Sequence, residues 1–376
     1  MISVFEPQIG EEEIAAVVSA LRQGEISGSF GHALAEFERA FAAYVGCRHG
    51  IAVNSGTSAL QLAVLAAGVK PGDEVLVSAS TNIATALAAV HAGAIPVPVD
   101  SENETWNLDL DLIERLITPR SRAIIPVHLF GHPVDMDRLL ALAQRHQLIV
   151  IEDCAESHGA TCRSRMTGSF GAMGCFSFYA NKVITTGEGG MVVTDRDDLA
   201  ERLRLLRNLA FTQPRFRHEL AGFNYRLTNY QAAMGLAQLA KIDQILADKR
   251  RVALAYNQRL HQVPGLQLPV EKDWARNIYW MYGVVVGPRF GLGRDALAAE
   301  LRTRGIDTRT FFCPMNQQPV LRQLPGFCAD PCPVADALWE RGLYLPSSTT
   351  LRNADIDLIC ATIASLAAKP AAGRAR

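Results

Sequence analysis

The sequence predicts an α/β fold, with a large domain built on a mostly parallel, mixed central sheet covered by helices and a smaller C-terminal α+β domain. Short runs rich in Val and Ile alternate with helical patterns between residues 51 and 207. These runs lack the apolar–polar alternation of half-exposed strands, so we expect them to be buried on both faces. The pattern changes after Pro264-Gly265, which predicts the second domain.

The expected strands of the large domain cover residues 51–54, 74–78, 95–99, 123–128, 148–152, 174–179 and 190–194. Helical stretches between them cover residues 57–67, 81–92, 109–117, 135–146 and 196–207. Repeated strand–helix units favour a parallel sheet. The Gly-rich link before the last strand is too short for a helical crossover, so we expect at least one antiparallel strand.

Helical patterns also flank this region. One covers residues 9–24, and a long one over 228–260 leads out of the large domain. The second domain should contain strands at 278–286 and 306–311 and helices at 294–304 and 354–368. We therefore place the large domain at residues 1–250 and the small domain at residues 251–376.

Composition excludes several classes of protein. The 376 residues are 49% hydrophobic and 20% charged, which predicts a globular chain. Thirty-seven basic against 38 acidic residues leave a net charge of −1, which argues against a nucleic-acid surface. We find no membrane-spanning run and no signal-peptide order, so we expect a cytoplasmic protein with no membrane contact. The eight cysteines are scattered without a C-x2-C pair, so we expect no metal site.

A candidate phosphate-binding segment, Asn54-Ser55-Gly56-Thr57-Ser58, lies where the first expected strand gives way to a helix. Glycine lets the backbone approach a ligand, and the hydroxyl and N–H groups at a helix start suit a phosphate. A plain helix N-cap is the alternative, because Ser and Thr are favoured there anyway. Neither a dinucleotide glycine fingerprint nor a P-loop follows an expected strand, which disfavours an NAD-linked oxidoreductase.

Lys182 is the most informative basic residue, because only six of the 37 basic residues are lysines. It follows an apolar strand and precedes a Gly-rich turn, so we expect its amino group to be partly desolvated. A lysine in such a setting forms a Schiff base with an aldehyde. Asp153 ends another strand, where an acid can hold a pyridinium nitrogen protonated. Taken alone, Lys182 could instead be a solvated surface charge, and Asp153 could instead cap the next turn. The candidate phosphate-binding segment, Asp153 and Lys182 nevertheless follow one another along the chain in the order expected for one cofactor, pyridoxal phosphate.

These motifs resemble the fold-type-I pyridoxal-phosphate enzymes, specifically the sugar aminotransferase family named for DegT, DnrJ, EryC1 and StrS. The resemblance covers nearly the whole chain and includes NSGTSAL, LIVIEDCAESHGA, YANKVITTGEGGM and GFNYRLTNYQAAMGLAQL. The last two segments are most similar to the GDP-perosamine synthase branch, which aminates C4 of a keto-deoxyhexose nucleotide. The resemblance implies an aminotransferase that acts on a nucleotide-linked ketosugar, with L-glutamate as donor, in cell-surface polysaccharide (O-antigen) or glycoconjugate biosynthesis.

The resemblance also implies a role for each motif residue. Lys182 would bond to the cofactor aldehyde and shuttle protons, and Asp153 would pair with the pyridine nitrogen. Glu156 occupies the position that hydrogen-bonds the cofactor's phenolic oxygen. Asn224 would reach the cofactor phosphate of the neighbouring subunit, which implies a homodimer with shared active sites. The residues implied for the phosphate within the chain are Gly56, Thr57, Ser58 and Ser177.

Several positions near the expected substrate depart from the family pattern or are open to interpretation. Asn82 stands where the family usually has an aromatic residue stacked on the cofactor ring, so that stacking is lost or relocated. Asn316 replaces the histidine of the family's Pro-x-His segment. Candidate substrate contacts are Asn316, Ser27 in the GEISG segment, and Arg217 with His218, for which a solvated basic loop is the alternative.

Alternative functions remain open. The acceptor could be a different ketosugar or a keto-acid sugar. A related dehydratase branch has histidine in place of the lysine, so Lys182 argues against it. A non-catalytic regulator of the same fold is disfavoured by the intact lysine, acid and phosphate segment. His158 and Trp280 are interpreted as structural residues, with Trp280 packed in the core.

Overall fold

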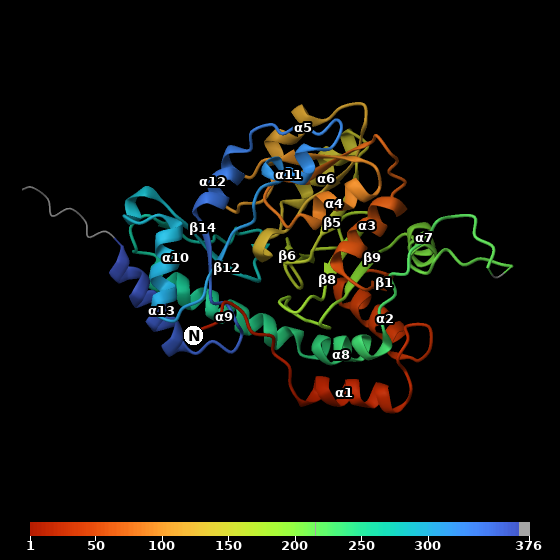
Figure 1. Cartoon of the computed structure of the whole chain (residues 1–376), viewed down its shortest axis with the longest axis horizontal. Coiled ribbons are helices and arrows are strands. Elements are labelled where there is room, and N and C mark those ends of the chain that lie inside the picture. Colours follow the sequence, from red (N-terminus) through yellow and green to blue (C-terminus); the bar gives the residue numbers. More distant parts are fainter. Residues whose placement is uncertain (215, 368–376) are drawn as a thin grey trace, which may run out of the picture.

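The computed structural model describes residues 1–214 and 216–367, so position 368 of the expected final helix lies outside the described residues. A seven-stranded sheet with the order β1-β9-β8-β5-β4-β2-β3 forms the centre (Figure 1). Strand β9 is antiparallel to β1 and β8, and the other neighbouring pairs are parallel, which confirms the predicted mixed sheet. The strands are β1 His49–Val53, β2 Glu74–Ser78, β3 Ile95–Val99, β4 Ser121–Ile125, β5 Ile149–Asp153, β8 Met173–Ser177 and β9 Gly190–Thr194.

Helices cover both faces of this sheet. Successive side chains of a strand point to opposite faces, and β9 shows the consequence. Met191 and Val193 belong to the same apolar cluster as Phe37 and Phe41 of one helix, whereas Val192 packs in the cluster on the other face. The covering helices of the large domain are α2 Ala33–Val45, α3 Gly56–Ala66, α4 Ala84–His91, α5 Ile113–Leu116, α6 Met136–Arg145 and α7 Asp197–Arg207.

The long helical pattern predicted over residues 228–260 is confirmed as helical, and the structure divides it into two helices. Helix α8 covers Asn229–Ala240 and α9 covers Ile242–Leu260, with Lys241 in a non-helical conformation between them. The Lys241 ammonium lies 2.6 Å from the Glu13 carboxylate on α1 (Glu11–Arg22), which packs beneath α8 (Figure 1). This ion pair with a distant helix accompanies the break.

The small part of the molecule is an antiparallel sheet with the order β10-β12-β14-β13, covered by helices (Figure 1). Ile2 donates a backbone hydrogen bond to Gly305, so the first residues of the chain pack against this part. Helix α9 runs through position 250, and the domain limits proposed from the sequence stay a prediction. The elements are β10 Leu266–Gln267, β12 Tyr282–Val286, β13 Arg309–Thr310, β14 Gly342–Leu345, α10 Arg294–Thr303, α11 Pro319–Arg322, α12 Pro333–Arg341 and α13 Asn353–Leu366.

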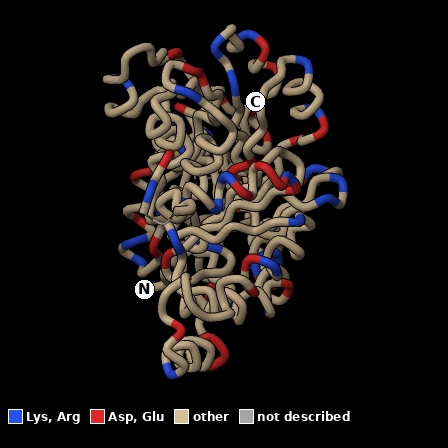
Figure 2. Tube along the Cα trace, turned by 90° about the vertical axis from the view of Figure 1, so that its right-hand side faces the viewer, with Lys and Arg blue, Asp and Glu red and all other residues tan. Residues whose placement is uncertain are grey.

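The two parts share an aromatic core. The ring of Phe130, from the turn that follows β4, lies 4.7 Å from that of Phe311 and 5.0 Å from that of Tyr344, both from the small part. A further three-stranded sheet joins β11 Ala275–Arg276 to β6 Thr161–Cys162 and β7 Arg165–Met166. Basic and acidic residues are interspersed along the chain (Figure 2). Among the described residues, no helix combines the length and apolarity needed to cross a membrane.

Candidate active site

The carboxyl ends of β1, β2, β4, β5 and β8 meet around one cavity of about 250 Å³. This edge of an open α/β sheet is where ligands bind, because the loops that follow several strands converge there. The cavity brings together residues that are up to 257 positions apart in the sequence, from Ser55 to Phe312. The sequence-predicted residues that line it are Gly56, Thr57, Asn82, Asp153, Glu156, Ser177 and Lys182.

One end of the cavity is the amino terminus of α3. Ser55 caps this helix, and its side chain accepts the N–H of Ser58 at 3.1 Å. The N–H groups of Gly56 and Thr57 precede the first intrahelical donor, so they are available at the helix start. A Cβ on Gly56 would lie 2.7 Å from the Ser177 Cβ, so only glycine fits here. These groups form a compact anion site.

Ser58, which the sequence also assigned to the phosphate, faces away from the cavity. Its side chain is buried, and its hydroxyl donates to the Asn54 side chain at 2.7 Å. Ser58 therefore stabilises the turn that presents Gly56 and Thr57, and it is not among the described residues that line the cavity.

Asp153, at the end of β5, is buried and held from two sides. One carboxylate oxygen accepts the Ala155 N–H at 3.1 Å, and the other accepts the Thr85 hydroxyl at 2.8 Å. Burial raises the pKa of Asp153, whereas these two hydrogen bonds and the Lys182 charge act in the opposite direction. Thr85 lies 68 positions earlier in the chain, and sequence reasoning assigned it no role.

Lys182 lies on the loop that follows β8, with its half-buried side chain directed into the cavity. Burial lowers the pKa of its amino group, and the nearby carboxylates of Glu156 and Asp153 raise it by a smaller amount. A lowered pKa increases the fraction of uncharged amine at neutral pH, which is the nucleophilic form.

Glu156 lies one turn beyond Asp153 and accepts the Phe130 N–H at 2.8 Å. Phe130 adopts a left-handed backbone conformation with φ 53°, which aims its N–H at this carboxylate. Burial raises the pKa of Glu156 to about 7. The group therefore changes its charge near neutral pH, beside the amino group of Lys182.

The raised pKa of Glu156 predicts a pH-dependent cost in stability. The folded protein retains this proton up to about pH 7, while the unfolded chain releases it near 4.5. Folding stability is therefore lost as the pH rises between these values, by ~3 kcal/mol in total. We expect Glu156→Gln, which mimics the protonated acid, to raise the melting temperature of the cofactor-free chain at pH 8 and not at pH 4.5.

The matched control is Glu188→Gln, which removes an exposed carboxylate from the rim of the same cavity. Differential scanning calorimetry of wild type and both variants from pH 4.5 to 8 provides the comparison. A Glu156→Gln effect that is equal at all pH values would show that folding does not raise the pKa of this carboxyl. An effect shared by Glu188→Gln would show that it is not specific to Glu156.

Aromatic side chains form another wall of the cavity. Trp280, Phe312 and Tyr179 line it. Trp280 is also buried in the apolar cluster that joins the two parts of the molecule, so its interpretation as a core residue is correct but incomplete. Asn82, at the position of the usual stacking residue, is exposed at the rim, and its side chain accepts the Ala84 N–H at 3.0 Å.

A buried polar cluster includes the residues on either side of Asp153. His128, Glu152 and Cys154 bring possible metal-ligand atoms within 4.8 Å of one another. Both ring nitrogens of His128 already have partners, because the Val134 N–H bonds to Nδ1 and the other nitrogen lies 3.1 Å from Glu152. Glu152 also accepts the backbone N–H groups of Gly168, Phe170 and Gly171. The cluster therefore anchors the loop before β8.

His158 packs between aromatic rings, 5.2 Å from Phe176 and 6.3 Å from Phe41. Burial lowers its pKa to about 3, with a smaller contribution from the Lys182 charge. The imidazole is therefore neutral at physiological pH, and His158 is not among the described residues that line the cavity. This packing agrees with its interpretation as a structural residue.

Four further candidates lie outside the described lining of the cavity. Ser27, Arg217 and His218 are exposed on loops. Asn316 is buried and turned toward Asp336, to which its side-chain amide donates at 3.2 Å. Within one chain, the structure therefore does not bring these residues to Lys182, and their roles in substrate binding stay predictions.

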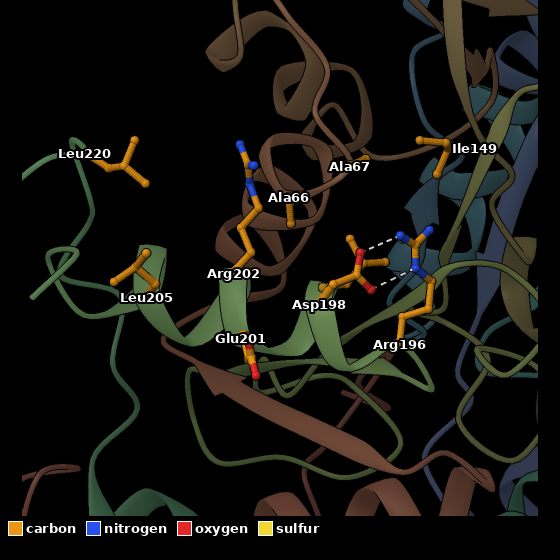
Figure 3. Close-up of a pocket in the computed structure, with 10 residues that line it drawn as sticks. Ala66, Ala67, Ile149, Arg196, Asp198, Glu201, Arg202, Leu205 and Leu220 are labelled. Carbon is orange, nitrogen blue, oxygen red and sulfur yellow. Dashed lines mark hydrogen bonds and ion pairs between the residues drawn. The ribbon is translucent and has the colours of Figure 1, made fainter. Parts of the chain in front are cut away.

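A second hollow of about 480 Å³ lies between α7 and the end of α3 (Figure 3). Arg196 and Asp198 pair with each other at its edge, with 3.0 Å between the guanidinium Nε and a carboxylate oxygen. Arg202 and Glu201 extend from α7 in opposite directions. None of the sequence-predicted site residues is among its described lining, so the cavity at Lys182 is the candidate active site.

Comparison with known proteins agrees with this geometry. Residues 7–364 match the DegT/DnrJ/EryC1/StrS aminotransferase family. GDP-perosamine synthase of Caulobacter vibrioides is 44% identical over 364 residues, which cover 96% of this chain and 97% of that protein. The dTDP-3-amino-3,4,6-trideoxy-alpha-D-glucose transaminase of Streptomyces venezuelae is 41% identical over 83% of this chain and 81% of its own length. The crystal structure of S. venezuelae DesV in complex with a ketimine intermediate superposes with a TM-score of 0.89 at 38% identity, covering 96% of this chain and 95% of that one.

Proposed function

Because the chain belongs to the DegT/DnrJ/EryC1/StrS aminotransferase family, we propose that it transfers an amino group from L-glutamate to a nucleotide-linked keto-deoxysugar, with pyridoxal phosphate as cofactor. C4 of a GDP-linked sugar is the favoured acceptor, since the 44% identical relative is a GDP-perosamine synthase. The observation that carries the proposal is the convergence of Gly56, Asp153 and Lys182 on one cavity.

The residues of the cavity fit pyridoxal phosphate. The helix start at Gly56 and Thr57, with the Ser177 hydroxyl beside it, suits the phosphate. A Cβ on Gly56 would fill this cradle. The buried Asp153 suits the ring nitrogen, and Glu156 suits the phenolic oxygen. Bound pyridoxal phosphate supplies an aldehyde that takes up the amino group and a ring that withdraws electrons from the adjacent C–H bond.

The side chains of the chain itself would bind, orient and move protons. The uncharged amine of Lys182 would hold the cofactor through its aldehyde and, when free, would carry a proton between the donor carbon and the neighbouring carbon. Asp153 would keep a proton on the ring nitrogen, and the hydrogen bonds from Ala155 and Thr85 hold its carboxylate in place. The buried Trp280 and the half-buried Phe312 form a wall that would exclude water from these steps.

A homodimer with shared sites belongs to the proposal. Asn224 is exposed and is not among the residues that line the cavity of its own chain, so it could reach only another subunit's cofactor. Large apolar side chains are exposed on the segments that carry Ser27 and Asn224, namely Ile26, Phe30 and Leu220. Exposed apolar side chains on these two segments are consistent with burial in a protein–protein interface.

The visible absorption spectrum of the purified chain tests the proposal. We expect a yellow band after addition of pyridoxal phosphate, loss of this band on addition of L-glutamate, and formation of one equivalent of 2-oxoglutarate. A GDP-linked 4-keto-deoxyhexose should then restore the band and release the aminosugar, so that the amino group is conserved between donor and acceptor.

Each other outcome favours a named alternative. Restoration of the band by a UDP- or dTDP-linked ketosugar, or by a keto-acid sugar, would replace the acceptor and keep the chemistry. A band that ignores glutamate would replace the donor. If no band forms, the catalytic proposal fails, and a regulator of the same fold becomes the better interpretation.

A further inference from the structure

Trp280 places its indole ring directly against the amino group of Lys182. The Lys182 Nζ lies 3.8 Å from the centre of the ring. The indole N–H also donates to the carbonyl of Asn181 at 2.7 Å. One side chain from the small part of the molecule therefore contacts both the amino group of the lysine and the backbone of the loop that carries it.

Trp280 is itself held in place by a buried lysine on α9. Lys249 is only 2% exposed, and its ammonium donates to the carbonyl of Trp280 at 2.9 Å and to that of Ser347 at 2.7 Å. The Ser347 hydroxyl in turn accepts the Tyr282 N–H at 2.9 Å. These bonds tie the segment around Trp280 to α9 and to the residues after β14.

We propose that Trp280 is a catalytic residue that covers and orients the Lys182 amino group, and that Lys249 is a positioning residue that acts through Trp280. This inference rests on the proposed function, because it concerns the amine that would bond to the cofactor. Trp280 contacts the reacting nitrogen directly, whereas Lys249 reaches it only through the tryptophan.

The ring and the carboxylates act on Lys182 in the same direction. The face of an indole carries partial negative charge and stabilises a cation above it. The titratable groups that face Lys182 are the carboxylates of Glu156 and Asp153, with His158 behind them. The burial of Lys182 acts in the opposite direction to the ring and the two carboxylates, because it disfavours the charged form of the amine. Trp280 thus keeps part of the affinity of this amine for a proton while it excludes water, which suits a group that must both lose and regain a proton.

Two substitutions at Trp280 distinguish the effect of the aromatic face from the effect of an apolar side chain that only fills space. Trp280→Phe keeps an aromatic face and loses the bond to Asn181, whereas Trp280→Leu also loses the aromatic face. In the cofactor-free full-length chain, we expect Trp280→Leu to lower the pKa of Lys182 by about half a unit or more, and Trp280→Phe to lower it less. The rate of acetylation of each lysine by acetic anhydride, followed by mass spectrometry across pH, measures this pKa. The exposed Lys70 is the internal reference.

Lys249→Met removes the ammonium at nearly constant volume, and Lys249→Gln keeps one N–H donor group if the first variant does not fold. We expect either change to lower the pKa of Lys182 in the same direction as Trp280→Leu, and to have no additional effect in combination with it. A residue that merely supports the fold would lower the melting temperature without moving this pKa. Additive shifts in the double variant would overturn the positioning role.

The outcomes separate this inference from the proposed function. If wild type forms the yellow band with pyridoxal phosphate but Trp280→Leu leaves the pKa of Lys182 unchanged, the role of Trp280 is refuted and the aminotransferase proposal stands. If wild type forms no band, the proposed function fails whatever the labelling shows.

Discussion

Lys182→Arg should abolish transamination, with a loss of at least about 10⁴-fold in turnover, because the nucleophile and the proton carrier are the same amine. Arginine keeps a positive charge opposite Glu156 and Asp153, so the cavity is not left with unpaired carboxylates. A guanidinium does not deprotonate in proteins and cannot bond to an aldehyde in this way. Turnover with glutamate and the ketosugar nucleotide, measured with excess enzyme, checks the loss.

The six lysines of the chain allow a direct test of this assignment. Borohydride reduction of wild type loaded with pyridoxal phosphate should leave the cofactor on the peptide that contains Lys182 and on no other. Lys70→Arg, at an exposed position, is the matched control and should retain full turnover. Cofactor on another lysine, or turnover by Lys182→Arg or Lys182→His, would remove Lys182 from its role.

Asp153→Asn should reduce turnover by about 10²–10³-fold while the chain still folds and binds the cofactor. The amide has the same shape as the carboxylate, and its oxygen can accept the Ala155 N–H. It carries no charge to hold a proton on the ring nitrogen, so the electron-withdrawing effect of the ring is weakened. The rate at which glutamate bleaches the visible band measures this effect before the ketosugar is involved.

Thr85 provides a matched pair for the same carboxylate. Thr85→Val removes the hydroxyl that donates to Asp153 at 2.8 Å, whereas Thr85→Ser keeps it. We expect about a tenfold loss for the valine variant and little change for the serine variant. If Asp153→Asn retained more than a tenth of the wild-type rate, the ring nitrogen would need no charged partner, and this assignment would be wrong.

Most of the large sheet and the order of groups at its edge could be predicted from local patterns. Gly56, Asp153 and Ser177 each follow or end a strand, and a strand shows its position through a short apolar run between turns. The topology of an α/β sheet then places these ends at one edge. The tight link before β9 predicted the antiparallel strand for the same local reason.

Contacts between distant segments could not be predicted in this way. Trp280 is 98 positions from Lys182, and an aromatic residue near a strand is as compatible with plain core packing as with a catalytic contact. The break between α8 and α9 coincides with an ion pair between Lys241 and Glu13. The spacing of apolar residues along a helix cannot predict a contact between such distant residues. Asn316 turns toward Asp336, although the motif position suggested the substrate.

The sequence by itself therefore determined the class of fold and the family, and it identified the residues that we propose hold pyridoxal phosphate. Each of these depends on residue types at short spacing, which local backbone preferences and motifs encode. Only the tertiary structure decided how that chemistry is tuned. Burial changes the pKa of Lys182 and Glu156, and the indole of Trp280 lies against the amino group of Lys182. Burial and ring contacts arise when segments far apart in the chain pack together, so they depend on the whole fold.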